Sequence, residues 1–213
     1  MDFIIERSHI IFKHLIHVGP EIDADAVADF AVRKDYQKST RNLKTPKGIL
    51  KEYLFRPKTN PQSLIVFSSK GFVIDAQPSE AVLPLFRDAY DFYEKVMGDT
   101  SMTATVVMDI KGIFEVFSPE PVESFIGKFF DKPSSEFKLG NYQLSPHGFI
   151  LGFGSGKFPE ESIQLTLQPL PKDQERRLLL NVVYRSTQLD DALKFIETIS
   201  DNLKKTLTKI AKK

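Results

Sequence analysis

Four short segments of this chain repeat one order of residue types: a polar residue, any residue, a basic residue, glycine and two apolar residues. They are TPKGIL (45–50), SSKGFV (68–73), DIKGIF (109–114) and SPHGFI (145–150). A Ser, Thr or Asp at the first position can hydrogen-bond its own backbone, and glycine at the fourth accepts the left-handed conformation that closes a tight hairpin. Each segment therefore predicts a turn between antiparallel strands, and the chain is expected to build an antiparallel sheet.

The basic residue of each predicted turn lies at a hairpin tip. One interpretation is that these four tips contact an anionic partner, and the other is that an exposed turn position simply tolerates a basic side chain. The binding residues that the first interpretation predicts are Lys47, Lys70, Lys111 and His147.

Two long segments show helical periodicity. From Ser79 to Gly98, apolar residues recur at three- and four-residue spacing. Near the C-terminus an apolar residue recurs every seven positions, with acidic residues early and lysines late, as the helix dipole favours. These patterns predict two amphipathic helices, near 80–97 and 188–210, that pack on a sheet. The seven-residue repeat consists of Leu189, Ile196, Leu203 and Ile210.

The other elements follow from β-branched and aromatic runs. Shorter helices are expected at 21–34 and 121–130, and the segment 33–47, which has no periodicity, is expected to be a surface loop. Strands are expected at 8–18, 49–56, 64–67, 72–76, 103–117, 137–153, 162–169 and 177–186.

The order of elements in 8–98 recurs in 103–211, which indicates an internal duplication. IVFSSKGFVIDA (65–76) also aligns with YQLSPHGFILGF (142–153) at a constant offset of 77 residues. We therefore expect an α+β fold with two similar halves, 1–100 and 101–213. Joined edge to edge, the halves would form one long, curved antiparallel sheet with both long helices on one face.

This order resembles the duplicated fold of the TATA-box-binding protein family, in which a saddle-shaped antiparallel sheet carries helices on its convex side. The resemblance is one of topology over most of the chain, and no DNA-contact residue of that family is matched by position. Residues 50–117, which include KEYLFRPKTNPQSLIVFSSKGFVIDAQ (51–77), also resemble a sporadically distributed prokaryotic family of unknown function. Met108, Asp109 and Ile110 stand where that family has an arginine-containing strand motif.

Charge is unevenly distributed along a chain whose net charge is only +1. Residues 33–58 carry a net +7, and residues 75–131 carry a net −7. The two regions could face different partners or each other in an oligomer, or they could be solvated surfaces. The overall balance argues against a dedicated nucleic-acid-binding protein. The predicted binding residues in the basic region are Arg33, Lys34, Lys38, Arg41 and Lys44.

Composition excludes several classes of protein. The chain has no cysteine, which rules out disulfides, thiol catalysis and thiolate zinc sites. It has no apolar run of about 18 residues, so we expect neither a transmembrane helix nor a membrane partner. The N-terminal stretch MDFIIERSHIIFKH is interrupted by charges and makes a poor signal peptide, so a soluble cytoplasmic protein is expected.

No catalytic, metal or cofactor site is predicted. GFGSGKF (152–158) fails as a phosphate loop, because Leu151 and Phe158 stand where glycine and a hydroxyl residue are required. His14 and His17 would point to opposite sides of a strand, which prevents chelation of a metal. Most of the 18 phenylalanines are expected in the core. Phe149 and Phe153 are the two that could instead stack on bases or line an apolar pocket.

These observations predict a non-enzymatic binding module that uses the exposed face of a duplicated sheet, with a protein partner or a second copy as the occupant. Two alternatives stay open. One is a nucleic-acid-binding protein that uses the basic segment 33–58. The other is a small-molecule-binding protein or enzyme with a phenylalanine-lined apolar pocket between the sheet and the helices.

Overall fold

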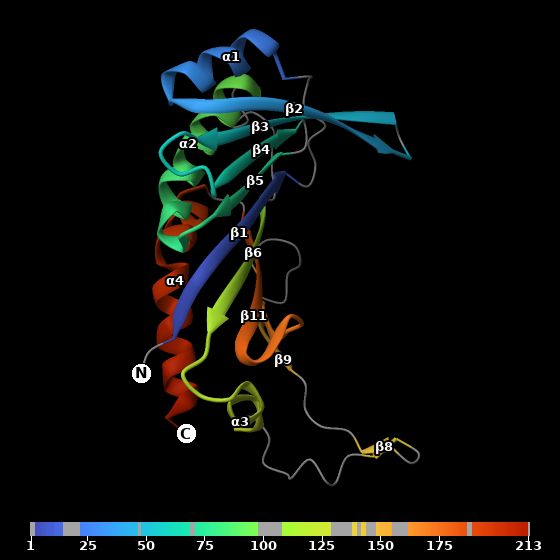
Figure 1. The fold of residues 1–213 in the computed structure, drawn as a ribbon, viewed down its shortest axis with the longest axis vertical. Coiled ribbons are helices and arrows are strands. Elements are labelled where there is room, and N and C mark those ends of the chain that lie inside the picture. The colour runs from blue at the N-terminus through green and yellow to red at the C-terminus, as the bar shows by residue number, and fades with distance from the viewer. Residues whose placement is uncertain are drawn as a thin grey trace.

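The computed structural model describes residues 3–14, 22–46, 48–68, 71–97, 108–128, 138–139, 142–143, 148–154, 162–186 and 189–212. Within these residues the chain forms one open nine-stranded antiparallel sheet, a separate two-stranded sheet and four α-helices (Figure 1). The expected α+β class with an antiparallel sheet is confirmed.

The large sheet has the strand order β2-β3-β4-β5-β1-β6-β11-β10-β9. Its strands are β1 (Ile4–His14), β2 (Tyr36–Thr45), β3 (Gly48–Pro57), β4 (Leu64–Ser68), β5 (Gly71–Ala76), β6 (Met108–Phe117), β9 (Phe149–Gly154), β10 (Ser162–Leu170) and β11 (Asp173–Ser186). The small sheet pairs β7 (Lys138–Leu139) with β8 (Tyr142–Gln143). The helices are α1 (Ala24–Arg33), α2 (Val82–Met97), which follows the 3-10 turn η1 (Ser79–Ala81), α3 (Val122–Gly127) and α4 (Leu189–Ala211).

Two of the four predicted hairpin turns are confirmed. Thr45 pairs with Gly48 at the β2–β3 turn, where Thr45 Oγ1 donates a hydrogen bond of 2.8 Å to the Gly48 carbonyl. Ser68 pairs with Gly71 at the β4–β5 turn. Both glycines have positive φ angles, +124° and +134°, in the region that residues with a Cβ avoid.

The third predicted turn, at 109–114, is wrong, because this segment lies inside the continuous strand β6. Gly112 pairs with Ile10 on one side and Val182 on the other. A Cβ at position 112 would lie 2.6 Å from Phe114 Cε2, so glycine here makes room for a buried ring and forms no turn. The fourth turn falls on 145–150, of which 145–147 lie outside the described residues.

The prediction of a loop at 33–47 is also wrong, because β2 occupies Tyr36–Thr45. Nine of the ten residues of β2 are exposed or half-buried, and Tyr36 is the one that is buried. A strand with both faces exposed has no alternation of apolar and polar residues, which is the signal that identifies a half-buried strand. β2 and β3 form a hairpin that projects beyond the neighbouring strands (Figure 1).

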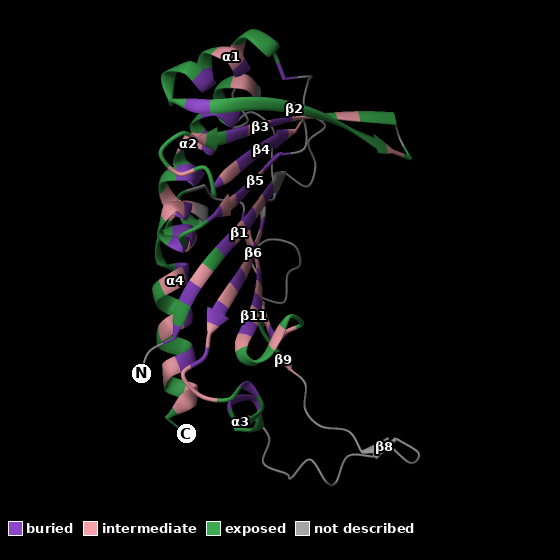
Figure 2. Cartoon of the chain, viewed as in Figure 1, coloured by how far each residue is buried: buried purple, intermediate pink, exposed green. Residues whose placement is uncertain are grey.

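Both long helices pack on the same face of the sheet, as expected. Phe12 of β1, Ile110 of β6 and Tyr184 of β11 are register partners across three adjacent strands, so their side chains share one face. The ring of Phe86 in α2 lies 5.9 Å from that of Phe12, and the ring of Phe195 in α4 lies 4.3 Å from that of Tyr184. Figure 2 shows the buried residues that line these strands.

Aromatic rings fill the space between the first five strands of the sheet order and helices α1 and α2. Phe92 of α2 lies 4.6 Å from Phe30 of α1 and 4.7 Å from Phe67 of β4, measured between ring centroids. Phe12 stacks on Phe72 of β5 at 4.7 Å. Each such ring removes about 150–250 Å² of apolar surface from water, so this cluster is the main stabilising core of that part of the molecule.

Outward from the central pair β1–β6, the strands on both sides follow one another in reverse chain order. β5 and β11 come next on either side, followed by β4 and β10, and then by β3 and β9. The alignment of 65–76 with 142–153 does not respect this order, because it matches β5, which neighbours β1, with β9, which lies at the end of the sheet. The alignment at an offset of 77 residues therefore matches two strands that do not occupy corresponding positions on the two sides of the central pair.

Candidate docking surface

The sheet face opposite α2 and α4, here called the open face, carries a row of mainly apolar side chains. Pairing of the strands aligns one residue from each of nine strands in this row. The ring contacts of α1, α2 and α4 with the strands lie on the other face, at Phe55, Phe12 and Tyr184. In sheet order the row is Ser39, Leu54, Val66, Val73, Ile11, Lys111, Val183, Gln164 and Gly152.

Most apolar members of this row are half-buried by their neighbours on the sheet, and Val66 is buried at 8% exposure. Leu64 of β4 and Ile113 of β6 lie in the adjacent row and extend the apolar surface. An apolar strip that crosses adjacent strands without a covering helix is typical of an interaction surface.

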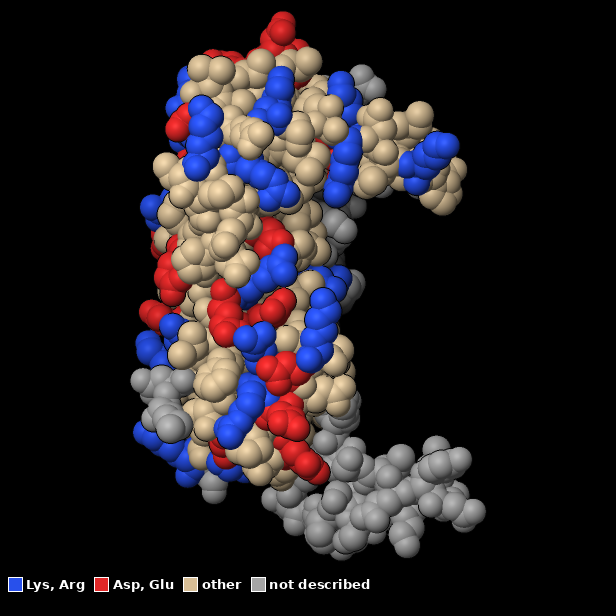
Figure 3. Space-filling model, in the orientation of Figure 1, with Lys and Arg blue, Asp and Glu red and all other residues tan. Residues whose placement is uncertain are grey.

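Ion pairs flank the apolar row on the same face. Arg7 of β1 contacts Asp75 of β5 on one side and Glu115 of β6 on the other, the second at 3.7 Å. Arg177 of β11 contacts Glu6 of β1 at 3.1 Å. Figure 3 shows acidic and basic side chains that adjoin in this way across the middle of the molecule. The charges of this region therefore largely neutralise one another.

His9 lies beside these ion pairs, between Asp75 on β5 and Ile113 on β6. Burial lowers the pKa of His9 below its ordinary value of 6.5; Asp75 opposes this effect, while Arg7 and Lys111 add to it. The imidazole is therefore held mainly neutral at neutral pH.

The structure separates the predicted basic residues into two groups. Three of them already have carboxylate partners: Arg33 contacts Asp29, Lys34 contacts Asp88 at 2.7 Å, and Arg41 contacts Glu52. Asp88 also accepts a hydrogen bond from the Tyr36 hydroxyl, and burial together with this carboxylate raises the pKa of Tyr36.

The second group has no carboxylate partner among the described residues. Lys38 and Lys44 lie on one face of the exposed strand β2. Lys111 was predicted at a hairpin tip, and this prediction is wrong. It lies in the middle of β6, where it is half-buried in the apolar row. Lys47, Lys70 and His147 lie outside the described residues.

The two predicted phenylalanines lie on β9, at one edge of the sheet. Phe149 pairs with Leu167 and packs against the core, so it belongs to the helix-covered face and not to the open face. Phe153 pairs with Ile163 through its backbone. Phe149 therefore does not support base stacking on the open face.

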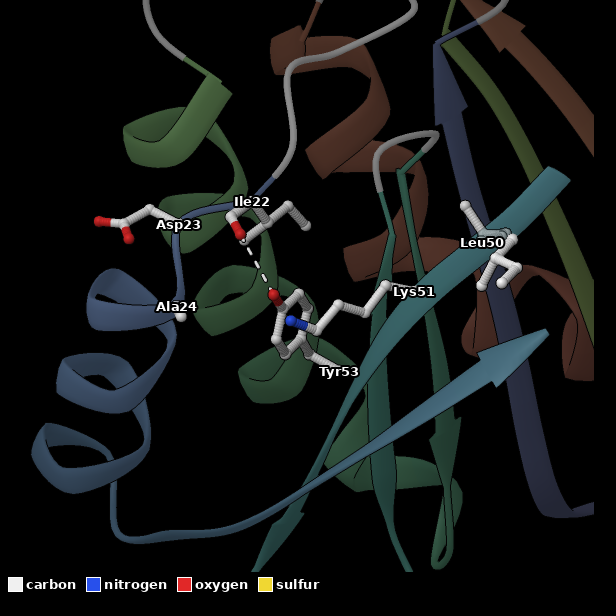
Figure 4. A pocket seen from close by; sticks show the side chains of 7 residues that line it. Ile22, Asp23, Ala24, Leu50, Lys51 and Tyr53 are labelled. Carbon is white, nitrogen blue, oxygen red and sulfur yellow. Dashed lines mark hydrogen bonds between the residues drawn. The ribbon is translucent and has the colours of Figure 1, made fainter.

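A hollow of about 430 Å³ separates the start of α1 from β3. Its walls are Ile22, Asp23, Ala24, Ile49, Leu50, Lys51 and Tyr53. The Tyr53 hydroxyl donates a hydrogen bond of 3.2 Å to the Ile22 carbonyl, and Lys51 Nζ lies 5.1 Å from the centre of the Tyr53 ring. Figure 4 shows Lys51 and Tyr53 on the side toward Ile22, while Leu50 points away.

A second hollow, of about 500 Å³, lies where the start of β1 meets the end of α4. Phe3, Ile4, Lys204, Lys205, Thr208 and Lys209 line it. The described residues that line the two hollows do not bring together a nucleophile, a base and an orienting group, which nucleophilic catalysis requires.

Sequence reasoning missed the apolar members of the open-face row. A local signal for them exists, because the central strands carry consecutive apolar residues in place of an alternating pattern. Ile11, Val66 and Val73 each stand between two apolar neighbours that face the core. Apolar residues on both sides of a strand indicate that neither face is fully solvated.

Within the described residues, no cluster of three or more His, Asp or Glu side chains has the arrangement of a metal site. No helix in the described part is long and apolar enough to cross a membrane. The chain matches no protein-family model, no curated protein and no solved structure.

Proposed function

We propose that this protein is a non-enzymatic docking module that binds a protein partner on the open face of its sheet. The observation that carries the proposal is the row of Leu54, Val66, Val73, Ile11 and Val183, which crosses the middle of the sheet opposite both long helices and is interrupted only by Lys111, between Ile11 and Val183. An apolar centre beside a rim of charged side chains is the usual anatomy of a protein–protein interface.

The ion pairs beside the row support a protein partner over a polyanion. Arg7 and Arg177 each contact two carboxylates, so their positive charges are neutralised, and Lys111 is left as a cation within the row that has no carboxylate partner among the described residues. A nucleic-acid surface needs unpaired cations that can replace counterions on phosphates. The nucleic-acid alternative is further weakened because Arg33, Lys34 and Arg41 already have acidic partners.

The alternative of a small-molecule pocket needs a cavity between the sheet and the helices. Rings from both sides meet in this space: Phe12 of β1 contacts Phe86, Tyr90 and Tyr93 of α2 at centroid distances of 5.7–6.0 Å. Direct ring contact favours a packed interior, so a ligand would have to displace core residues.

We also propose that the docking platform arose by duplication, so that 3–97 and 108–212 are two similar halves of one curved sheet. Support comes from the strand order, which reads β5, β4, β3 outward from β1 and β11, β10, β9 outward from β6. The antiparallel pairing of β1 with β6 is the arrangement that a two-fold axis between the halves requires. An experimental structure tests this: matched strands must superpose, and unrelated strand lengths and tilts would contradict it.

The docking proposal is tested by photocrosslinking from the open face. Benzoylphenylalanine is placed at Val183, in the apolar row, and separately at Asn202, which is exposed on α4. The expected result, in extract of the source cells, is one discrete adduct from position 183 and none from position 202.

A substitution in the same row completes the test. Ile11→Asp combined with the crosslinker at 183 should abolish the adduct, because a charge in the row opposes apolar contact. Circular dichroism of that variant verifies that the sheet is intact. An adduct with a second copy of the chain in purified protein identifies self-association as the function of the face. Equal adducts from both positions, or none, would overturn the proposal.

A further inference from the structure

β2 ends the sheet, and its outer side is unpaired among the described strands. In an antiparallel ladder every second residue directs its N–H and C=O groups away from its one partner. The ten residues of β2 therefore present a row of backbone donors and acceptors along one side. Such an edge can take up a further strand.

The described residues leave room for an added strand along the outer part of β2. Tyr36 at its start is covered by α1, where its ring stacks on Phe30 at 5.5 Å. From Gln37 to Lys44 every residue is exposed, on both faces of the strand. The end of the hairpin near its turn projects beyond the neighbouring strands and beyond α1, whereas α1 runs beside the first part of β2 (Figure 1).

The side chains of β2 define the charge of the strand that would fit. Lys38, Arg41 and Lys44 are its charged residues, and it carries no acid. Lys38 and Lys44 lie on the same face, six residues or about 20 Å apart, and neither contacts a carboxylate of the described residues. Arg41 lies on the other face and contacts Glu52 of β3.

The opposite edge of the sheet shows that this charge is particular to β2. β9 has the sequence FILGFG, with no charged residue, and Ile150 and Leu151 are 64% and 44% exposed. Lysines on an edge strand repel neutral or basic strands and so prevent uncontrolled pairing. The same lysines favour an acidic strand, because opposite charges placed across two strands attract.

We propose that the outer edge of β2 binds an extended acidic segment of a partner protein by strand addition, with carboxylates opposite Lys38 and Lys44. Backbone hydrogen bonds supply most of the affinity in such complexes, and the side chains select the sequence. The apolar residues of the open-face row lie on other strands, and only Ser39 of β2 belongs to that row, so either proposal can fail without the other.

The test uses the whole chain and a fluorescein-labelled peptide of five Thr-Glu repeats, which places all carboxylates on one face of a strand. Binding is measured by fluorescence anisotropy, and protection of β2 amides by hydrogen exchange. Each cross-strand charge pair contributes about 0.2–1 kcal/mol. The double variant K38Q/K44Q should therefore weaken binding about 2- to 30-fold.

Two controls separate strand addition from general attraction of anions. K205Q/K209Q makes the same change of charge on exposed positions of α4 and should leave the affinity unchanged. The same peptide with alternate amides N-methylated keeps its charge but cannot pair, and should not bind. Equal binding of the methylated peptide, or its displacement by a 20-base-pair DNA duplex, would show a general anion site and overturn the proposal. So would the absence of binding at millimolar peptide.

Discussion

Arg7 of β1 and Asp75 of β5 are diagonal neighbours on adjacent strands, and Arg7 Nε donates a hydrogen bond of 2.8 Å to Asp75 Oδ1. This hydrogen bond is the largest influence on the Arg7 guanidinium, whose pKa it raises. Asp75 also lies opposite His9 in the strand register. Burial is the largest influence on the pKa of His9, and the pair adds two opposing charges: Asp75 raises this pKa and Arg7 lowers it.

We expect His9 to titrate below its ordinary pKa, and two substitutions to move that pKa in opposite directions. Asp75 raises the pKa of His9, so Asp75→Asn should lower it further. Lys111 lowers it, so Lys111→Gln should raise it. NMR titration of the His9 Cε1 proton measures both. Shifts of the same sign in the two variants would contradict this arrangement of charges.

The lowered pKa also predicts a pH dependence of stability. The unfolded chain takes up a proton at His9 near pH 6.5, whereas the folded chain does so only at lower pH. Stability should therefore begin to fall as the pH drops through 6.5, and this loss should be complete below the folded pKa. Urea unfolding of the wild type and of His9→Asn between pH 7.5 and 5 measures the difference. Because both proteins share the same carboxylates, parallel curves would show that His9 does not contribute.

Gly112 in the middle of β6 should not tolerate even a methyl group. A Cβ there would lie 2.6 and 2.8 Å from two ring atoms of Phe114 and 3.3 Å from Ile10 Cδ1. Both neighbours are fully buried, so neither side chain can move into solvent. We expect Gly112→Ala to lower the free energy of unfolding by about 1–3 kcal/mol, the usual cost of overpacking.

Gly127 of α3 provides the matched control for that substitution. No atom lies within 4 Å of a Cβ built at this position. Alanine is a better helix former than glycine, so Gly127→Ala should leave stability unchanged or raise it by up to about 1 kcal/mol. Equal destabilisation by the two substitutions, in urea unfolding, would contradict the packing at Gly112.

The sequence was sufficient to predict those elements that depend on residues close to one another in the chain. The turns at Gly48 and Gly71 need a residue that accepts positive φ, and the long helices need an apolar stripe, so both leave a mark in the sequence. Gly112 shows the limit of this approach. It occurs in the same residue pattern as the two turn glycines, but the reason for it is the ring of Phe114.

The candidate surfaces depend on long-range pairing, which the linear sequence does not contain. Ile11, Val66 and Val183 become members of one row only through the register of four successive strand pairs. The basic segment 33–58 was recognised as a binding candidate from its charge. Only its part Tyr36–Thr45 becomes an exposed edge strand, because β2 pairs with β3 and with no other described strand, and that depends on tertiary structure.

The stacking of Phe195 on Tyr184, with ring centroids 4.3 Å apart and planes 11° apart, should be a main contact that holds α4 on the sheet. Phe195→Ala removes a half-buried ring, and we expect it to lower the free energy of unfolding by about 2–3 kcal/mol. A double-mutant cycle with Tyr184→Ala should give a coupling of about 0.5–1.5 kcal/mol, the range for aromatic pairs.

Glu197, two residues along the same helix, is the control for this prediction. Its carboxylate contacts Arg87 of α2, but both side chains are substantially exposed, at 40% and 58%. Exposed ion pairs contribute about 0–1 kcal/mol because water screens them, so Glu197→Ala should cost much less than Phe195→Ala. If the two substitutions had equally small effects, helix α4 would not be held by apolar contact with β11. In that case the assignment of the opposite face as the open one would lose its basis.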